Sequence, residues 1–113
     1  MDCIFCSIAE GKIPAETIYK DDEIIVFKDL NPQAPIHLLA IPKAHIASNN
    51  EINSDNSALI GRIFEVIAKL AKELGFDEDG YRIVNNCGEH GGQTVGHIHY
   101  HVLAGRNLQW PPG

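Results

Sequence analysis

The chain has 113 residues, of which 44% are hydrophobic and 21% charged, a composition typical of a globular protein with its own core. Its formal net charge of -6 argues against a protein that binds the nucleic-acid backbone, and no apolar run approaches the roughly 20 residues that cross a bilayer. The N-terminus lacks the pattern of a signal peptide, and three cysteines make a poor disulfide framework. We therefore expect a single domain over residues 1–113, located in the cytoplasm, that binds neither membrane nor nucleic acid.

The order of the expected elements favours an antiparallel sheet. Branched and aromatic residues predict strands, Asp21-Asp22 predicts a hairpin turn, and apolar residues at helical spacing predict one long helix that ends at Gly75. In chain order we expect a short helix over 3–10, strands over 17–20, 23–28 and 36–41, a long helix within 54–75, and strands over 81–85 and 98–104. This order indicates an α+β fold of two layers, an antiparallel β-sheet with one long helix and a short N-terminal helix.

Three histidines stand at every second position in the run HIHYHVLAG, residues 97–105. Because side chains two apart on a strand point to the same face, His97, His99 and His101 should share one face, opposite the apolar residues between them. A half-buried strand with polar residues on its outer face would also give an alternating pattern. The regular repeat of an uncommon residue nevertheless favours a functional row of imidazoles.

Such a row can bind a metal ion or act on a phosphate. Two histidines at i and i+2 can ligate one zinc ion, but the outer Cα atoms lie roughly 13 Å apart, which suits a row of groups along a ligand better. A neutral imidazole can attack phosphorus, and a protonated one can donate to phosphate oxygens. The loop that precedes the strand favours the phosphate alternative, because it offers backbone and side-chain donors for an anion at Gly88, Gly91, Gly92, Gln93 and Thr94.

The run from His97 to Leu103 has the pattern His, apolar, His, apolar, His and two apolar residues, and it resembles the motif of the histidine triad (HIT) family. Further segments resemble the nucleotide-binding branch of that family: IPA (13–15), FKDLNPQAPIHLLAIPKAHI (27–46), YRIVNN (81–86), GGQTV (91–95) and WPPG (110–113). The resemblance covers nearly the whole chain, and it implies a HIT-like fold and a homodimer.

The resemblance also implies an enzyme that binds purine nucleoside monophosphates and hydrolyses phosphoramidates, such as adenosine monophosphate joined to an amine. His99 would attack the α-phosphorus and form a nucleotidyl-histidine intermediate, His101 would donate to the phosphate, and His97 would support the site. The implied nucleotide-binding residues are Asp29 at the ribose, Asn86, Gln93 and Thr94 near the phosphate and leaving group, and Ile4, Phe5 and Leu30 around the base. From residue type alone, the three apolar residues would be assigned to the core, and Asp29 and Asn86 to turns.

Two alternatives to this function stay open at the level of sequence. One is a nucleotide-binding regulatory module whose catalysis is incidental, and the other is a dinucleoside polyphosphate hydrolase. The tail that ends in WPPG resembles the phosphoramidate-cleaving branch more than the dinucleoside branch. His90 and Gly96 depart from residues that relatives often carry, which leaves the preferred leaving group open.

Cys3 and Cys6 form a C-x-x-C pair, which is half of the ligand set of a structural zinc site. In bacterial members of the HIT family, this pair commonly binds zinc together with two histidines that correspond here to His45 and His97. The resemblance thus implies structural zinc as a cofactor, with His97 as a ligand that cannot also serve as an acid. We expect His37, in the third strand, to be structural.

Overall fold

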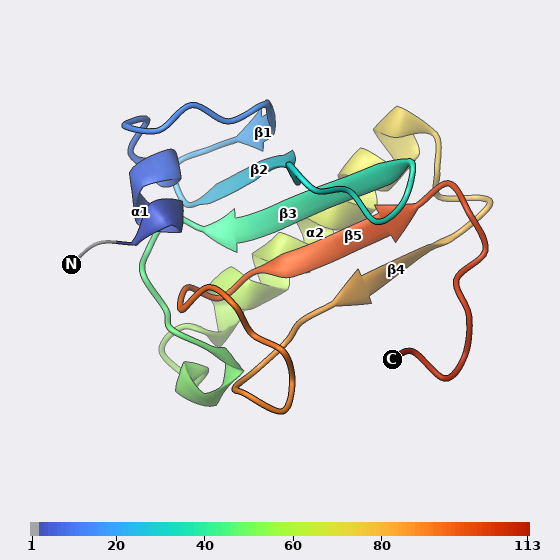
Figure 1. Cartoon of the computed structure of the whole chain (residues 1–113). Coiled ribbons are helices and arrows are strands. Elements are labelled where there is room, and N and C mark those ends of the chain that lie inside the picture. Colours follow the sequence, from blue (N-terminus) through green and yellow to red (C-terminus); the bar gives the residue numbers. More distant parts are fainter. Residues whose placement is uncertain (1–2) are drawn as a thin grey trace.

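The computed structural model describes residues 3–113, in which five strands form one antiparallel sheet (Figure 1). The elements are α1 (Ile4–Ala9), β1 (Thr17–Lys20), β2 (Ile24–Lys28), β3 (Ile36–Pro42), a short 3-10 helix η1 (Asn49–Glu51), α2 (Ser57–Leu74), β4 (Tyr81–Val84) and β5 (Tyr100–Ala104). The strand order is β1-β2-β3-β5-β4, and every neighbouring pair is antiparallel. The predicted α+β fold is therefore confirmed.

The long helix α2 covers one face of the sheet (Figure 1). Its buried residues Ile63, Val66, Ile67 and Leu70 follow helical spacing, so the same side of the helix faces the strands throughout. The helix ends at Gly75, as predicted, because this residue adopts the left-handed conformation with φ 82° and its N–H donates to the carbonyl of Ala71.

The short helix α1 covers part of the opposite face (Figure 1). Phe5 and Ile8 of this helix pack against Phe27 of β2 and Leu39 of β3. Strand alternation explains the two cores, since odd-numbered residues of β2 and β3 face α1 and even-numbered ones face α2.

The last strand is shorter than predicted and begins at Tyr100 instead of residue 98. The N–H of Ile98 donates to the carbonyl of Ile46 at 2.6 Å, and the side chain of Asn85 donates to the carbonyl of His99 at 3.0 Å. These bonds take the place of strand pairing, so His97 and His99 lie on the approach to β5. The alternation nevertheless persists, because the apolar residues between the histidines face α2 and the histidines face α1.

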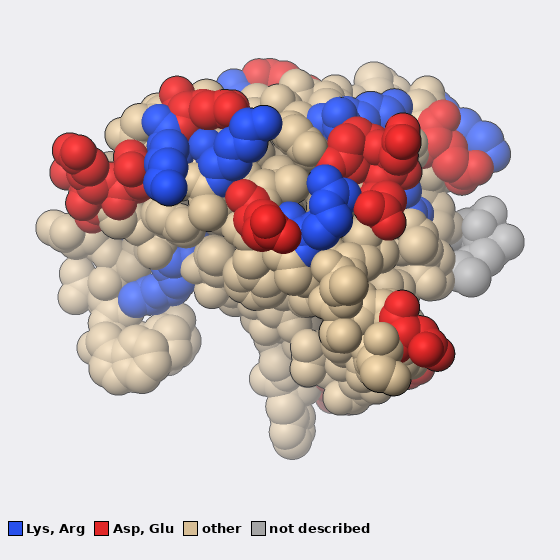
Figure 2. All heavy atoms as spheres, turned by 180° about the vertical axis from the view of Figure 1, so that it is seen from behind, with Lys and Arg blue, Asp and Glu red and all other residues tan. Residues whose placement is uncertain are grey.

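Within residues 3–113, no helix combines the length and the apolar character needed to cross a bilayer. Figure 2 shows acidic and basic side chains interspersed over the upper part of the rear face, on the side of α2. The lowest part of the same view carries few charged side chains.

Candidate active site

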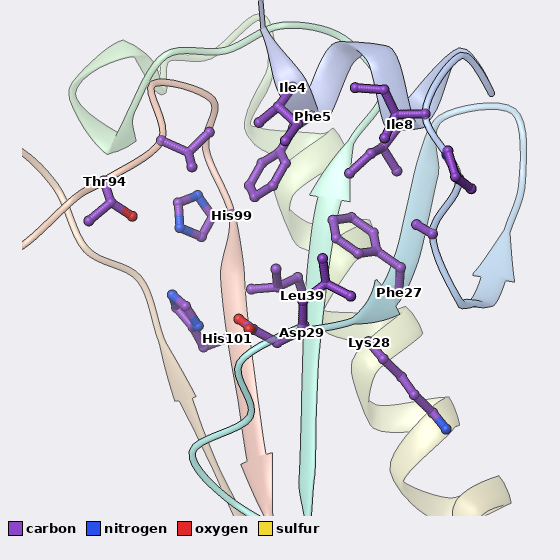
Figure 3. Close-up of a pocket in the computed structure, with 15 residues that line it drawn as sticks. Ile4, Phe5, Ile8, Phe27, Lys28, Asp29, Leu39, Thr94, His99 and His101 are labelled. Carbon is purple, nitrogen blue, oxygen red and sulfur yellow. The ribbon is translucent and has the colours of Figure 1, made fainter.

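A cavity of about 250 Å³ opens on the face of the sheet that carries α1 (Figure 3). At one end its wall is apolar and is formed by α1, the connection 13–15, Phe27 and Leu39. At the other end the lining side chains are those of Asp29, Thr94, His99 and His101. The cavity thus joins an apolar slot to a polar end beside β5, a shape that suits a ligand with an apolar ring and an anionic group.

The structure gathers most of the predicted site residues around this cavity. The predicted residues that line it are Ile4, Phe5, Asp29, Leu30, Thr94, His99 and His101. Three predicted residues lie elsewhere: His97 is fully buried behind Phe5, Asn86 lines a second cavity beside the C-terminal segment, and the Gln93 side chain is hydrogen-bonded to its own loop and to the carbonyl of Ala47. Sequence reasoning did not assign roles to Ile8, although it stands one helical turn after Ile4, or to Phe27 and Leu39.

The backbone holds His99 in one tautomer. Its Nδ1–H donates to the carbonyl oxygen of His97 at 2.8 Å, and the residue is only 4% exposed. With the proton on Nδ1, the neutral ring carries its lone pair on Nε2, which is the nitrogen left for the cavity. Phe5 contacts the ring edge-on, with centroids 5.2 Å apart, and restricts its rotation. The arrangement presents Nε2 as a nucleophile.

Hydrogen bonds in series fix the tautomer of His101. The backbone N–H of Gln33 donates to Nδ1 of His37 at 3.0 Å, so neutral His37 carries its proton on Nε2. That N–H donates to Nδ1 of His101 at 2.9 Å, and His101 keeps its own proton on Nε2 as a donor at the cavity. His37, expected to be structural, therefore positions a residue of the site. Its place on β3 contained the signal, since alternation puts it on the face of Leu39.

The surroundings keep both of these histidines neutral near pH 7. Burial lowers the pKa of His37 from its ordinary value of 6.5, although the carboxylate of Asp29, 3.5 Å away, acts to raise it. Burial also lowers the pKa of His101, and charge on His99 and His37 acts in the same direction. Neutral rings are what the series of N–H donors from Gln33 to His101 requires.

The glycine-rich loop over 86–96 is folded onto itself. The N–H of Gly92 donates to the carbonyl of Glu89, and that of Gln93 to the carbonyl of Gly88. A side chain at Gly91 would collide with the carbonyl oxygen of Cys87, so glycine is required there by close approach within the loop. The glycines shape the loop, and its contribution to the cavity wall comes from Thr94 and Val95.

The side chains of Cys3, Cys6, His45 and His97 form a cluster at the start of α1, with ligand atoms all within 4.8 Å of one another. The sulfur atoms lie 3.3–3.5 Å from the Nδ1 atoms of the two histidines. In a tetrahedral site with metal–sulfur bonds of about 2.3 Å and metal–nitrogen bonds of about 2.0–2.1 Å, this separation is about 3.6 Å. The four residues are therefore spaced as a tetrahedral metal site requires.

The chemistry of the cluster also suits a cation. His97 donates its Nε2–H to the carbonyl of Pro42 at 2.8 Å, which leaves the lone pair of Nδ1 directed at the two sulfur atoms. Burial raises the pKa of the Cys6 thiol, and the hydrogen bond and charge of Cys3 raise it further. A bound cation would reverse this effect by stabilising the thiolates.

The chain matches the protein family described as scavenger mRNA decapping enzyme C-term binding over residues 2–109. An uncharacterized HIT-like protein of Synechococcus elongatus is 46% identical over 112 residues, which cover 99% of this chain and 97% of the relative. The crystal structure of a HIT family hydrolase from Legionella pneumophila superposes with a TM-score of 0.97 at 51% identity, and the match covers 99% of this chain and 100% of that one.

Two further solved structures are similar over most of their length. A histidine triad nucleotide-binding protein from Candida albicans is 34% identical with a TM-score of 0.82, over 97% of this chain and 83% of that one. A zinc-bound histidine triad family protein from Mycobacterium smegmatis is 37% identical with a TM-score of 0.79, over 95% of this chain and 77% of that one.

Proposed function

The chain belongs to the histidine triad (HIT) family, and from this premise we propose that it is a purine nucleoside phosphoramidate hydrolase. The similar protein from Legionella pneumophila is a hydrolase, and the one from Candida albicans is a nucleotide-binding protein. The observation that carries the proposal is the imidazole of His99, whose Nδ1–H is held by the carbonyl of His97 while Nε2 is left for the cavity.

The nucleotide fits the two ends of the cavity in one orientation. The purine ring occupies the apolar slot between α1 and Leu30, whose side chain is 97% exposed and free to close over a base. The ribose hydroxyls donate to the carboxylate of Asp29, and the α-phosphate lies beside His99, His101 and Thr94. This orientation places phosphorus next to the nucleophile.

The reaction then proceeds in two displacements at phosphorus. Nε2 of His99 attacks phosphorus, the P–N bond breaks, and the leaving nitrogen takes a proton from solvent, while the Nε2–H of neutral His101 donates a hydrogen bond to a phosphate oxygen. The product of this step is a nucleotidyl-histidine. Water then attacks phosphorus and releases the nucleoside monophosphate, which regenerates neutral His99.

We also propose that Cys3, Cys6, His45 and His97 bind one structural zinc ion, as the spacing and chemistry of their cluster support. The zinc-bound relative from Mycobacterium smegmatis supports the same assignment. Zinc would hold α1 and the approach to β5 together and would take no part in the displacement. In this role His97 is structural, and it acts on the reaction only through its carbonyl oxygen.

A homodimer is part of the proposal. Strand β4 lies at an edge of the sheet, where it can pair with another chain, and Phe64 and Trp110 are large apolar residues with 44% and 81% of their surfaces exposed. None of the three cysteines, all of which lie within residues 3–113, forms a disulfide bond, which supports a reducing compartment such as the cytoplasm. Light scattering on the purified protein measures the assembly directly.

The test is to incubate the protein with an adenosine 5′-phosphoramidate of a simple amine and to follow release of adenosine monophosphate. The His99→Ala variant should lose turnover, whereas the matched control His90→Ala, an exposed loop position, should keep it. Full activity of His99→Ala would overturn the assignment of the nucleophile. Binding of adenosine monophosphate without turnover by the wild type would favour a regulatory module, and faster turnover of a diadenosine polyphosphate would favour the dinucleoside alternative.

A further inference from the structure

The side chain of Gln93 does not line the cavity, yet both ends of its carboxamide are hydrogen-bonded. Its Oε1 accepts the N–H of Gly88 at 3.0 Å, and its Nε2 donates to the carbonyls of Ala47 at 2.8 Å and Val95 at 3.0 Å. A carboxamide carries two donor hydrogens, so both are used. The N–H of Gly88 needs an acceptor, which fixes which end of the amide is oxygen.

These three bonds, which we call the Gln93 clasp, join segments that are distant in sequence. Gly88 and Val95 belong to the loop 86–96, whereas Ala47 lies in the segment 42–48, which begins at the last residue of β3. That segment is itself fixed to the triad, because its carbonyls accept the Nε2–H of His97 and the N–H of Ile98. The clasp thus fastens the loop to the same framework that holds the histidines.

Thr94 follows Gln93 directly and lines the polar end of the cavity with His99 and His101. The direction of the chain after Gln93 therefore decides whether the Thr94 side chain reaches a ligand there. We propose that Gln93 is a positioning residue, which acts on the α-phosphate through Thr94 and does not contact it. This inference rests on the proposed function, because it takes the polar end of the cavity as the place of the phosphate.

Two substitutions that keep the length of the side chain nearly unchanged distinguish the effect of the hydrogen bonds of the clasp from the effect of side-chain volume. Gln93→Glu keeps the acceptor for Gly88 but turns a carboxylate oxygen against two carbonyl oxygens, and Gln93→Met removes all three bonds without repulsion. Asn50→Asp is the control, since it adds the same charge at an exposed position of η1, three residues after Ala47. In residues 3–113 the Asn50 side chain makes no hydrogen bond.

The first measurement is amide hydrogen exchange over residues 86–96 in the full-length protein with its metal bound. We expect exchange in this loop to be about tenfold faster in Gln93→Glu than in Asn50→Asp, because the substitution breaks both bonds of Nε2 and sets a carboxylate oxygen against two carbonyl oxygens, which favours local opening of the loop. Exchange equal to that of the control would overturn the clasp.

The second measurement is the dissociation constant of adenosine monophosphate, together with kcat and KM on the adenosine phosphoramidate. We expect Gln93→Glu to weaken nucleotide binding and raise KM by about tenfold with kcat changed by less than about threefold, since the clasp supports binding in ground state and transition state alike. Gln93→Met should fall between Glu and wild type. Unchanged affinity, or a loss of kcat at constant KM, would overturn the positioning role.

The two measurements separate this inference from the proposed function. A wild-type protein that neither binds adenosine monophosphate nor cleaves the phosphoramidate would refute the proposed function, and the phosphate part of the inference with it. The exchange experiment needs no ligand, so it still decides whether Gln93 holds the loop. Wild-type activity with unaltered loop exchange in Gln93→Glu would refute the clasp and leave the proposed function standing.

Discussion

Replacing Phe5 by alanine should detach α1 from the sheet and open the apolar end of the cavity. Phe5 is 7% exposed, and its ring contacts Phe27 and His99 edge-on with centroids 5.6 and 5.2 Å away. Removal of a buried phenylalanine ring costs about 3–5 kcal/mol, and the lower value of about 3 kcal/mol applies here because the ring borders an open cavity. With an unfolding entropy of about 2.1 cal/mol/K per residue, or about 0.24 kcal/mol/K for this chain, the melting temperature should fall by about 12 °C.

Phe5→Leu is the matched control for this substitution. Leucine keeps most of the apolar volume and loses mainly the edge-on aromatic contacts, so we expect a cost of about 1 kcal/mol and a shift of about 4 °C. If the base occupies the slot, the alanine variant should lose about 50 Å² of apolar contact with it. At about 25 cal/mol per Å² this loss weakens binding of adenosine monophosphate by roughly tenfold.

Thermal unfolding followed by circular dichroism measures the first effect, and calorimetric titration at a temperature where both variants are folded measures the second. Phe5→Ala melting within about 3 °C of Phe5→Leu would show that α1 is not held by this ring. Unchanged affinity for adenosine monophosphate in Phe5→Ala would show that the base lies elsewhere, and it would refute the orientation proposed for the nucleotide.

Three further predictions follow from contacts of the site and the hairpin. His37→Phe removes the N–H that fixes His101, so kcat should fall by about tenfold or more while the affinity for adenosine monophosphate changes little, as steady-state kinetics and titration will show. Cys6→Ser should reduce the zinc content from about one ion per chain to nearly none, measured by elemental analysis, and lower the melting temperature. Burial acts to raise the pKa of Asp21, but hydrogen bonds from Tyr19, Arg62 and two backbone N–H groups outweigh it and hold that pKa well below its ordinary 3.8. The stability that this carboxylate contributes is therefore present above about pH 4 and lost as the pH falls. The melting temperature of Asp21→Asn should lie below that of the wild type at pH 7 and approach it near pH 2. A melting temperature lowered equally at both pH values would contradict the assignment.

Periodic patterns predicted most of the fold. The helical spacing of Ile63, Ile67 and Leu70 and the stop at Gly75 placed α2, and alternation placed the histidines on the face opposite Tyr100. These signals are local, since each depends only on where successive side chains point. The resemblance then connected Phe5 and Asp29 to the histidines across the sequence, which no local pattern could do.

The remaining features depend on contacts between distant segments. Nothing in the run 97–101 shows that Ile98 bonds to Ile46 and thereby delays the start of β5. The same holds for Gln93, whose sequence position next to Thr94 suggested a phosphate ligand, while its bond to Ala47 directs it away from the cavity. Such bonds depend on how the loops fold against one another, and the residue types of a loop do not predict this.

His97 has two structural roles at once. The ring of His97 offers Nδ1 to the two thiols of the cluster, while its carbonyl oxygen fixes the proton of His99. A substitution at position 97 that is accepted by one neighbour can still misplace the other. Any residue at position 97 supplies that carbonyl, but the bonds of the His97 ring to the thiols and to Pro42 help to fix where it lies. We therefore expect an engineered variant with a different set of metal ligands to hold the tautomer of His99 only if another contact keeps this carbonyl in place.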